Sequence, residues 1–171
     1  MGAYDRFKNL DAVMGVRNWI KEGNHVLQVR RTEMSKSKNP QKKGIEKAVV
    51  EFKTIKSDTQ KVGQICSLVE MESNQGYTGN VLMVTAGILG MDHEKMVEDP
   101  DFDAIFDAAW GTEQIFTGML VRCGAQQVKT SKGGDYTAKT WEPVPAAEYP
   151  EFGLIAPDGA YVPSEGEDAA A

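Results

Sequence analysis

The sequence predicts a mainly β domain with helices, in which three strands, a helical insertion and two further strands follow one another. Three observations lead to this prediction. Apolar and polar residues alternate with a period of two over residues 48–54, as in a strand with one buried face. Over residues 102–109 the apolar residues recur in steps of three and four, the spacing of a helix. A Gly-Gly pair at 133–134 separates two strand-like runs, as in a hairpin turn.

The first three strands are expected around residues 26–29, 47–54 and 62–71. A long loop, residues 35–44, joins the first two strands, and it contains four lysines, no acid and no large apolar side chain. Such a composition is typical of a solvated loop. A polar turn at 57–61 leads into the third strand, so the three strands are expected to form an antiparallel meander.

The helical insertion is expected after the third strand. Residues 80–90 are apolar with little alternation, and Asn80 and Gly90 are candidate end residues of a helix. A second helix is expected to begin with Asp99 as its N-cap and Pro100 at its first position.

Strand character returns over residues 116–128 and 136–142, on either side of the Gly-Gly turn. From residue 143 onward Pro, Gly and acidic residues accumulate, which predicts an extended segment over 143–156 and then a flexible tail. The expected organisation is an N-terminal helix or arm at 1–22, one domain at 23–156 and a flexible acidic tail at 157–171.

Length and composition fit one globular domain. The chain has 171 residues, of which 41% are apolar, enough for a core of its own. No run approaches the ~18 apolar residues that a membrane span needs, so we expect no membrane partner and a cytoplasmic location, which for a viral protein is the host cell cytoplasm. Cys66 and Cys123 fall in expected strands and are predicted to be reduced core residues rather than a disulfide.

Charge is divided unevenly along the chain. Residues 1–61 contain 14 Lys or Arg and 7 Asp or Glu, whereas residues 62–171 contain 5 and 18. The two parts therefore carry net charges of +7 and −13, which together give the overall charge of −6. This division predicts one surface that faces a polyanion and one that repels it. The alternative is a solvated surface with uneven charge.

The order of elements matches the five-stranded OB-type barrel, in which a helix between strands three and four closes one end. In that fold, nucleic acid binds across strands two and three, between the loop joining strands one and two and the loop joining strands four and five. Here those loops contain residues 36–43 and 129–132, and both are basic in an acidic protein. The sequence therefore predicts a nucleic-acid interface with lysines and arginines for phosphates and aromatic rings for bases.

The candidate nucleic-acid-binding residues are Arg30, Arg31, Lys36, Lys38, Lys42, Lys43, Lys53, Lys56, Tyr77, Lys129, Lys132, Tyr136 and Trp141. For each aromatic residue the alternative is packing in the core, and for each loop lysine it is a solvated side chain. Phe52 shares a strand face with Val50, so we expect it in the core.

Several segments resemble bacteriophage-encoded OB-fold single-stranded DNA-binding proteins: GNHVLQV, KAVVEFKTI, the hairpin VKTSKGGDYTAKTWEPV and the acidic C-terminus. The resemblance covers about residues 20–145. It implies a sequence-tolerant protein that protects and organises single-stranded DNA in replication or recombination, with no cofactor. In the wider class the acidic tail recruits replication or recombination proteins and usually ends in an apolar tip. This chain departs from that pattern, because it ends in Asp168 and three alanines.

No enzyme is expected, because the sequence contains no nucleophile elbow, phosphate-binding loop or dinucleotide fingerprint. Asp99, Pro100 and Asp101 resemble the start of a calcium loop, but Ala104 and Trp110 occupy the positions that require Gly and Glu, so no metal is expected. Two alternatives to DNA binding remain at this point: a structural or adaptor protein that uses the barrel to bind a protein, and a DNA-processing enzyme such as a nuclease. Basic residues on both flanking loops favour DNA binding.

Overall fold

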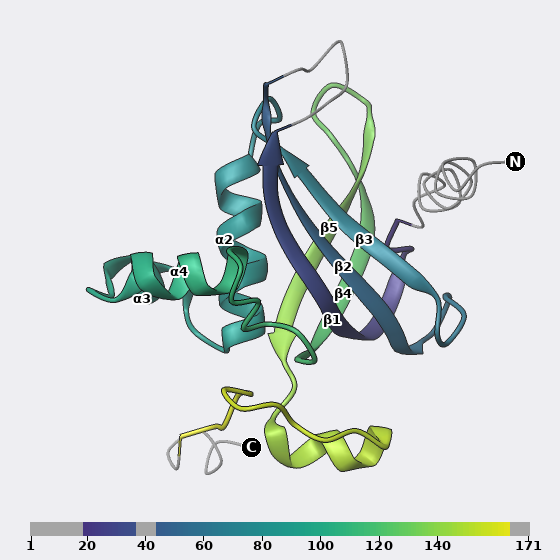
Figure 1. Ribbon diagram of the computed structural model, residues 1–171. Coiled ribbons are helices and arrows are strands. Elements are labelled where there is room, and N and C mark those ends of the chain that lie inside the picture. The colour runs from purple at the N-terminus through teal and green to yellow at the C-terminus, as the bar shows by residue number, and fades with distance from the viewer. Residues whose placement is uncertain (1–18, 37–43, 165–171) are drawn as a thin grey trace, which may run out of the picture.

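The computed structural model describes residues 19–36 and 44–164, and its centre is an open five-stranded antiparallel sheet (Figure 1). The strands are β1 (Gly23–Lys36), β2 (Glu46–Ser57), β3 (Ile65–Met71), β4 (Leu120–Lys129) and β5 (Asp135–Pro143). Their order in the sheet is β3-β2-β1-β4-β5, so the long strand β1 pairs with β2 on one side and with β4 on the other. The prediction of a mainly β protein with five strands and helices is confirmed.

The insertion between β3 and β4 contains three helices in the described part of the chain: α2 (Tyr77–Leu89), α3 (His93–Glu98) and α4 (Phe102–Trp110). The predicted N-cap of α2, Asn80, is four residues late, because Gly76 occupies the N-cap position in a left-handed conformation with φ 86°. Gly90 ends the same helix with φ 73°, as predicted. The short helix α3 was not predicted.

The ends of the strands also differ from the sequence prediction. β3 begins at Ile65 because Gly63 has φ +87° and Gln64 N donates to Lys61 O, which makes residues 61–64 a turn. The Gly-Gly turn between β4 and β5 is confirmed: Gly133 has φ 82°, and Thr130 N donates to Gly134 O over 2.7 Å.

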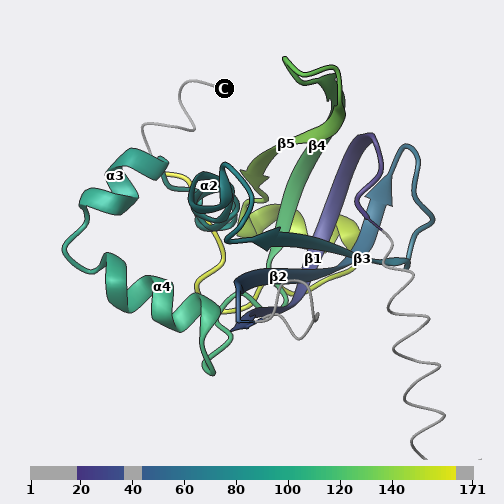
Figure 2. The same ribbon diagram turned by 90° about the horizontal axis from the view of Figure 1, so that it is seen from above.

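Helix α2 lies along the open side of the sheet, where β3 and β5 do not pair with each other. Figure 2 shows the sheet curving from β3 round to β5, with α2 beside the opening. Val84 and Ile88 of α2 are buried in the same apolar cluster as Val50 and Phe52 of β2. The helix therefore covers the open side of the sheet instead of one end of a closed barrel.

A second apolar cluster lies outside this core and involves the C-terminal segment. It contains Val26, Leu120, Val144 and Tyr149. The Tyr149 hydroxyl accepts a 2.7 Å hydrogen bond from Leu120 N, so the tyrosine is anchored to the sheet. The expectation of an extended segment at 143–156 is wrong over Ala146–Phe152, which form a 3-10 helix, η1.

The residues that follow η1 keep contact with the domain beyond the expected start of the tail at 157. Ala146 N donates to Tyr161 O over 2.8 Å, and the aromatic ring of Tyr161 lies against Gly90. The rest of the expected tail, 165–171, and most of the expected N-terminal helix or arm, 1–18, lie outside the described residues.

The contact between α2 and β5 predicts opposite effects for two Gly→Ala substitutions in the same helix. A Cβ at Gly87 would lie 2.2 Å from Trp141 Cβ and 3.1 Å from the Trp141 carbonyl carbon. Gly87→Ala should therefore lower the free energy of unfolding by about 1–3 kcal/mol through overpacking. Gly79 has nothing within 4 Å, so Gly79→Ala should raise it by about 0.5–1 kcal/mol through helix propensity alone. Urea denaturation measures both, and stabilisation by both substitutions would contradict the close packing of α2 on β5.

Candidate nucleic-acid interface

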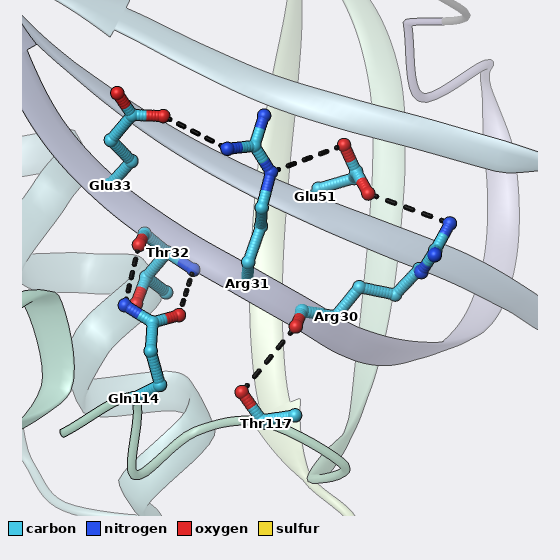
Figure 3. A network of polar contacts seen from close by, with 7 residues as sticks. All are labelled: Arg30, Arg31, Thr32, Glu33, Glu51, Gln114 and Thr117. Carbon is cyan, nitrogen blue, oxygen red and sulfur yellow. Dashed lines mark hydrogen bonds and ion pairs between the residues drawn. The ribbon is translucent and has the colours of Figure 1, made fainter. Parts of the chain in front are cut away.

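Two consecutive arginines of β1 project toward the same acid because the strand contains a bulge. Val29 pairs with Phe52 and Arg31 pairs with Glu51, so Arg30 is an extra residue in the ladder. A bulge of this kind changes the direction of the side chains beside it. As a result Arg30 Nη1 lies 3.5 Å from Glu51 Oε1, and Arg31 Nε lies 3.4 Å from Glu51 Oε2 (Figure 3).

The charges in this arginine cluster are balanced. Arg31 Nη1 also contacts Glu33 Oε2 at 3.0 Å, so two arginines face two glutamates. The Glu51 side chain is only 9% exposed, whereas both arginine side chains are 50% exposed. Each guanidinium carries five N–H donors, so donors remain on the solvent side for a phosphate. Excess positive charge on this face must come from lysines nearby.

The segment after α4 supports the strand that carries the arginines. Gln114 Oε1 accepts from Thr32 N at 3.0 Å, and Gln114 Nε2 donates to Thr32 O at 2.8 Å (Figure 3). Thr117 Oγ1 donates to Arg30 O at 3.4 Å. These groups pair with β1 beyond Gln28, where its pairing with β4 ends. Sequence reasoning missed Gln114, because no local pattern marks a side-chain amide that bonds to a strand backbone where a neighbouring strand would otherwise pair.

The outer face of the three strands β1, β2 and β3 carries further cations. Cys66 and Leu68 are buried, so the residues that alternate with them on β3, such as Ser67, face outward. On β2, Lys53 pairs with Gln28 of β1 and with Ile65 of β3. Lys47 pairs with Ser35 of β1 and with Met71 of β3. Lys53 was predicted as a site residue, whereas Lys47 was not.

Trp19 is a second residue that sequence reasoning did not select for the site. It belongs to the expected N-terminal helix or arm at 1–22, and the structure places it in a parallel β-bridge with Ser67 of β3. The signal that could have identified it is its type and position: a tryptophan four residues before Gly23, where β1 begins.

The β4–β5 hairpin and the ends of the strands β1 and β2 that flank residues 37–43 lie at the same end of the molecule (Figure 1). Figure 2 shows them apart across the open side. Lys36, Lys129 and Lys132 are exposed. The predicted site residues Lys38, Lys42 and Lys43 lie outside the described residues.

A groove of ≈ 760 Å³ opens at this end, between β3, the start of α2 and the hairpin. Its lining includes Glu70, Asn74, Asn80, Tyr136, Lys139 and Trp141. Tyr136 is 54% exposed, whereas the Trp141 ring stacks on Phe52 at a centroid distance of 5.6 Å. Of the predicted aromatic site residues, Tyr136 therefore offers the more accessible ring, and Trp141 joins the groove to the core.

Glu70 is the acid in this groove, and burial changes its chemistry. Desolvation raises the pKa of its carboxyl above the ordinary value of 4.5, although a hydrogen bond with Asn80 and the charge of Lys139 act in the opposite direction. Burial thus favours the neutral acid at this position. A neutral Glu70 would leave Lys139 as the charged residue of the groove lining.

The remaining predicted residues lie away from the groove centre. The Tyr77 hydroxyl donates to Glu46 Oε1 over 3.0 Å, and burial together with nearby glutamates raises the pKa of Tyr77 well above its usual range. Its ring packs against the main core. Lys56 pairs with Val26 and lines a different hollow, beside Arg122 and Glu142.

The described residues contain no group of three or more side chains that could hold a metal ion. His25 is buried, with Nδ1 2.7 Å from Ser57 Oγ and Nε2 2.7 Å from Lys21 O. Cys66 and Cys123 are free and buried, and burial raises the pKa of both thiols, that of Cys123 to about 12. Within the same residues, no helix combines the length and apolar character that crossing a membrane requires.

A scan against protein-family models found no match to this chain, and a search of curated proteins found none either. Function therefore has to be inferred from the sequence and from the geometry described above.

The raised pKa of Glu70 predicts a pH-dependent effect of Glu70→Gln. Stability that depends on a protonated Glu70 is complete below the ordinary pKa of 4.5 and is lost as pH rises through the raised value. The substitution removes this loss, so the variant should gain more stability over the unmodified protein at pH 7 than at about pH 4. Thermal unfolding at both pH values measures this gain. Glu113→Gln, the same change at an exposed position, is the control, and a gain that does not vary with pH would contradict the assignment.

Proposed function

We propose that this protein binds single-stranded DNA without strong sequence preference and protects and organises it during phage replication or recombination. The observation that supports this most is the placement of the groove. It lies at the end of the molecule where the ends of the basic loop and the Lys129–Lys132 hairpin lie, and exposed Tyr136 lines it. Lysines that neutralise phosphates beside an aromatic ring are what a single-strand site requires.

We also propose that the fold is an open variant of the OB barrel. The order β3-β2-β1-β4-β5, with β1 shared between the two halves, supports this. The position where β3 and β5 would close the barrel is filled by α2. Near the start of α2 the groove leaves room for bases beside Tyr136, and a complete β3–β5 ladder would occupy that room.

Single strands are favoured over duplex DNA because the accessible ring and the polar amides lie in a groove. Only an unpaired base can turn its face toward Tyr136 while the side chains of Asn74 and Asn80 meet its edge. The phosphates would then follow the exposed lysines. Because the arginine cluster is balanced by Glu33 and Glu51, those lysines supply most of the electrostatic attraction.

A protein-binding role is the second candidate, and the edge of β5 favours it. At the two ends of the β4–β5 pair, Thr130 N donates to Gly134 O and Val144 N donates to Leu120 O. Because hydrogen-bonded positions alternate along an antiparallel pair, the N–H and C=O groups of the even-numbered β5 residues point toward β4. The peptide groups of Lys139 therefore point away from β4, beside the groove. An edge of this kind fits an extended peptide added as a strand, and such binding would depend weakly on salt.

DNA binding should weaken steeply with salt. Each phosphate contact on a single strand contributes about −0.7 to the slope of log K against log salt, so several lysines predict a slope of magnitude above about 2. Fluorescence anisotropy with labelled single-stranded and duplex oligonucleotides measures this slope at several salt concentrations. Affinity that does not vary with salt, or equal affinity for the duplex, would count against the proposal and favour the protein-binding role.

The hairpin lysines should matter more than equally exposed lysines elsewhere. Lys129→Ala combined with Lys132→Ala removes two charges beside the groove and should reduce the magnitude of the salt slope by about 0.7 for each phosphate that these lysines neutralise. The control pair, Lys61→Ala with Lys95→Ala, removes the same charge from the β2–β3 turn and from α3. Both pairs are exposed, so thermal stability should hardly change. An equal decrease in affinity for the two pairs would show that only net charge matters.

A further inference from the structure

Trp19 presents its indole on the outer face of the sheet. Residues paired across neighbouring strands point their side chains to the same face. Because the flanking Cys66 and Leu68 are buried, Ser67 faces outward, and its parallel partner Trp19 does so too. Trp19 is 57% exposed, and no stacked or tilted ring contact of its indole occurs within the described residues.

The backbone next to Trp19 is held firmly, so its exposure does not result from a loose chain end. Ile20 is 3% exposed and belongs to the main core. Lys21 N donates to Gln60 Oε1 over 2.7 Å, and Lys21 O lies 2.7 Å from Nε2 of buried His25. Gln60 is itself buried and donates to Thr54 Oγ1 over 2.9 Å. The backbone that carries the indole is therefore preorganised, which lowers the entropic cost of binding a flat ligand on it.

The surroundings of Trp19 suit a nucleic acid strand. One cross-strand row runs from Trp19 through Ser67 and Glu51 to Arg31. Three strand spacings of about 4.8 Å separate its ends along the curved sheet, so the Trp19 and Arg31 backbones lie at most about 14 Å apart. The neighbouring row contains Lys53. An exposed aromatic ring thus shares one face with half-exposed guanidinium groups and a lysine, the combination found in single-strand sites.

We infer that Trp19 is a base-stacking residue and that the single-strand site continues from the groove across the outer face of β3. This inference rests on the proposed function and extends it, because it places an unpaired base on a residue outside both basic loops. The ligand class is single-stranded nucleic acid with at least one unstacked base available to the indole.

Intrinsic fluorescence can isolate this contact. Trp110 is 5% exposed and donates to Thr85 Oγ1 over 3.0 Å, so it is protected, whereas Trp141 lines the groove and is stacked on Phe52. Oligothymidylate can therefore quench the fluorescence of the unmodified protein through Trp19 and through Trp141. Trp19→Phe keeps an aromatic ring in place and should lose the Trp19 part of this quenching, so the difference between the two proteins isolates the contact.

Affinity gives the second measurement, by anisotropy with a labelled oligothymidylate. Trp19→Ala should bind about tenfold more weakly, as expected for the loss of one base–aromatic stack. The β-bridge is made by the backbone, so the variant should keep the fold, and circular dichroism checks this. Ile155→Ala is the control, since Ile155 is 93% exposed and belongs to the C-terminal segment.

The outcomes separate the two proposals. If the unmodified protein does not bind the oligonucleotide, both the proposed function and the stacking role fail. If it binds, but Trp19→Ala binds as tightly as Ile155→Ala, or quenching in Trp19→Phe is as large as in the unmodified protein, then only the stacking role of Trp19 is wrong. Smaller quenching in Trp19→Phe together with weaker binding of Trp19→Ala would support the inference.

Discussion

The packing of α2 against β5 is the contact on which the rest of the structure depends. A curved sheet whose outer strands do not pair leaves its apolar concave side uncovered, and α2 covers it. The helix approaches closely only because residue 87 has no Cβ to meet Trp141. Trp141 in turn stacks on Phe52 of β2, so this contact joins the helix to both halves of the sheet. The groove exists where α2 begins, because the helix does not extend further along the opening.

The outer face shows how charge can be concentrated without destabilising the sheet. Arg30 and Arg31 stand side by side because of the bulge, and like charges so close repel each other unless an acid lies between them. Glu51 provides that acid, nearly buried at the base of both side chains. The balance reduces the attraction of this face for phosphates but holds the guanidinium groups in defined positions. On this surface the arginines thus provide donors in defined positions, and the lysines provide the excess positive charge.

Much of the fold could be predicted from the sequence because it follows from short-range periodicity. Alternation identified β2, and three- and four-residue steps identified α4. The first residues of β3 and α2 were missed because Gly63 and Gly76 have positive φ, and such turns leave little trace in hydrophobic patterns. The candidate site was harder to predict. Tyr136 and the basic loops could be selected by type and position, whereas the bridge of Trp19 and the bonds of Gln114 to β1 depend on contacts between distant parts of the chain.

The reactivity of the two buried thiols can report when the strands of this domain separate. Cys66 belongs to β3 and Cys123 to β4, on opposite sides of β1. Burial keeps both in the protonated form, and only the thiolate reacts readily with alkylating reagents or oxidants. Each thiol is therefore unreactive toward these reagents while its strand is in the sheet, and it becomes reactive when the strand separates. The order in which the two thiols are modified would report which half of the sheet opens first.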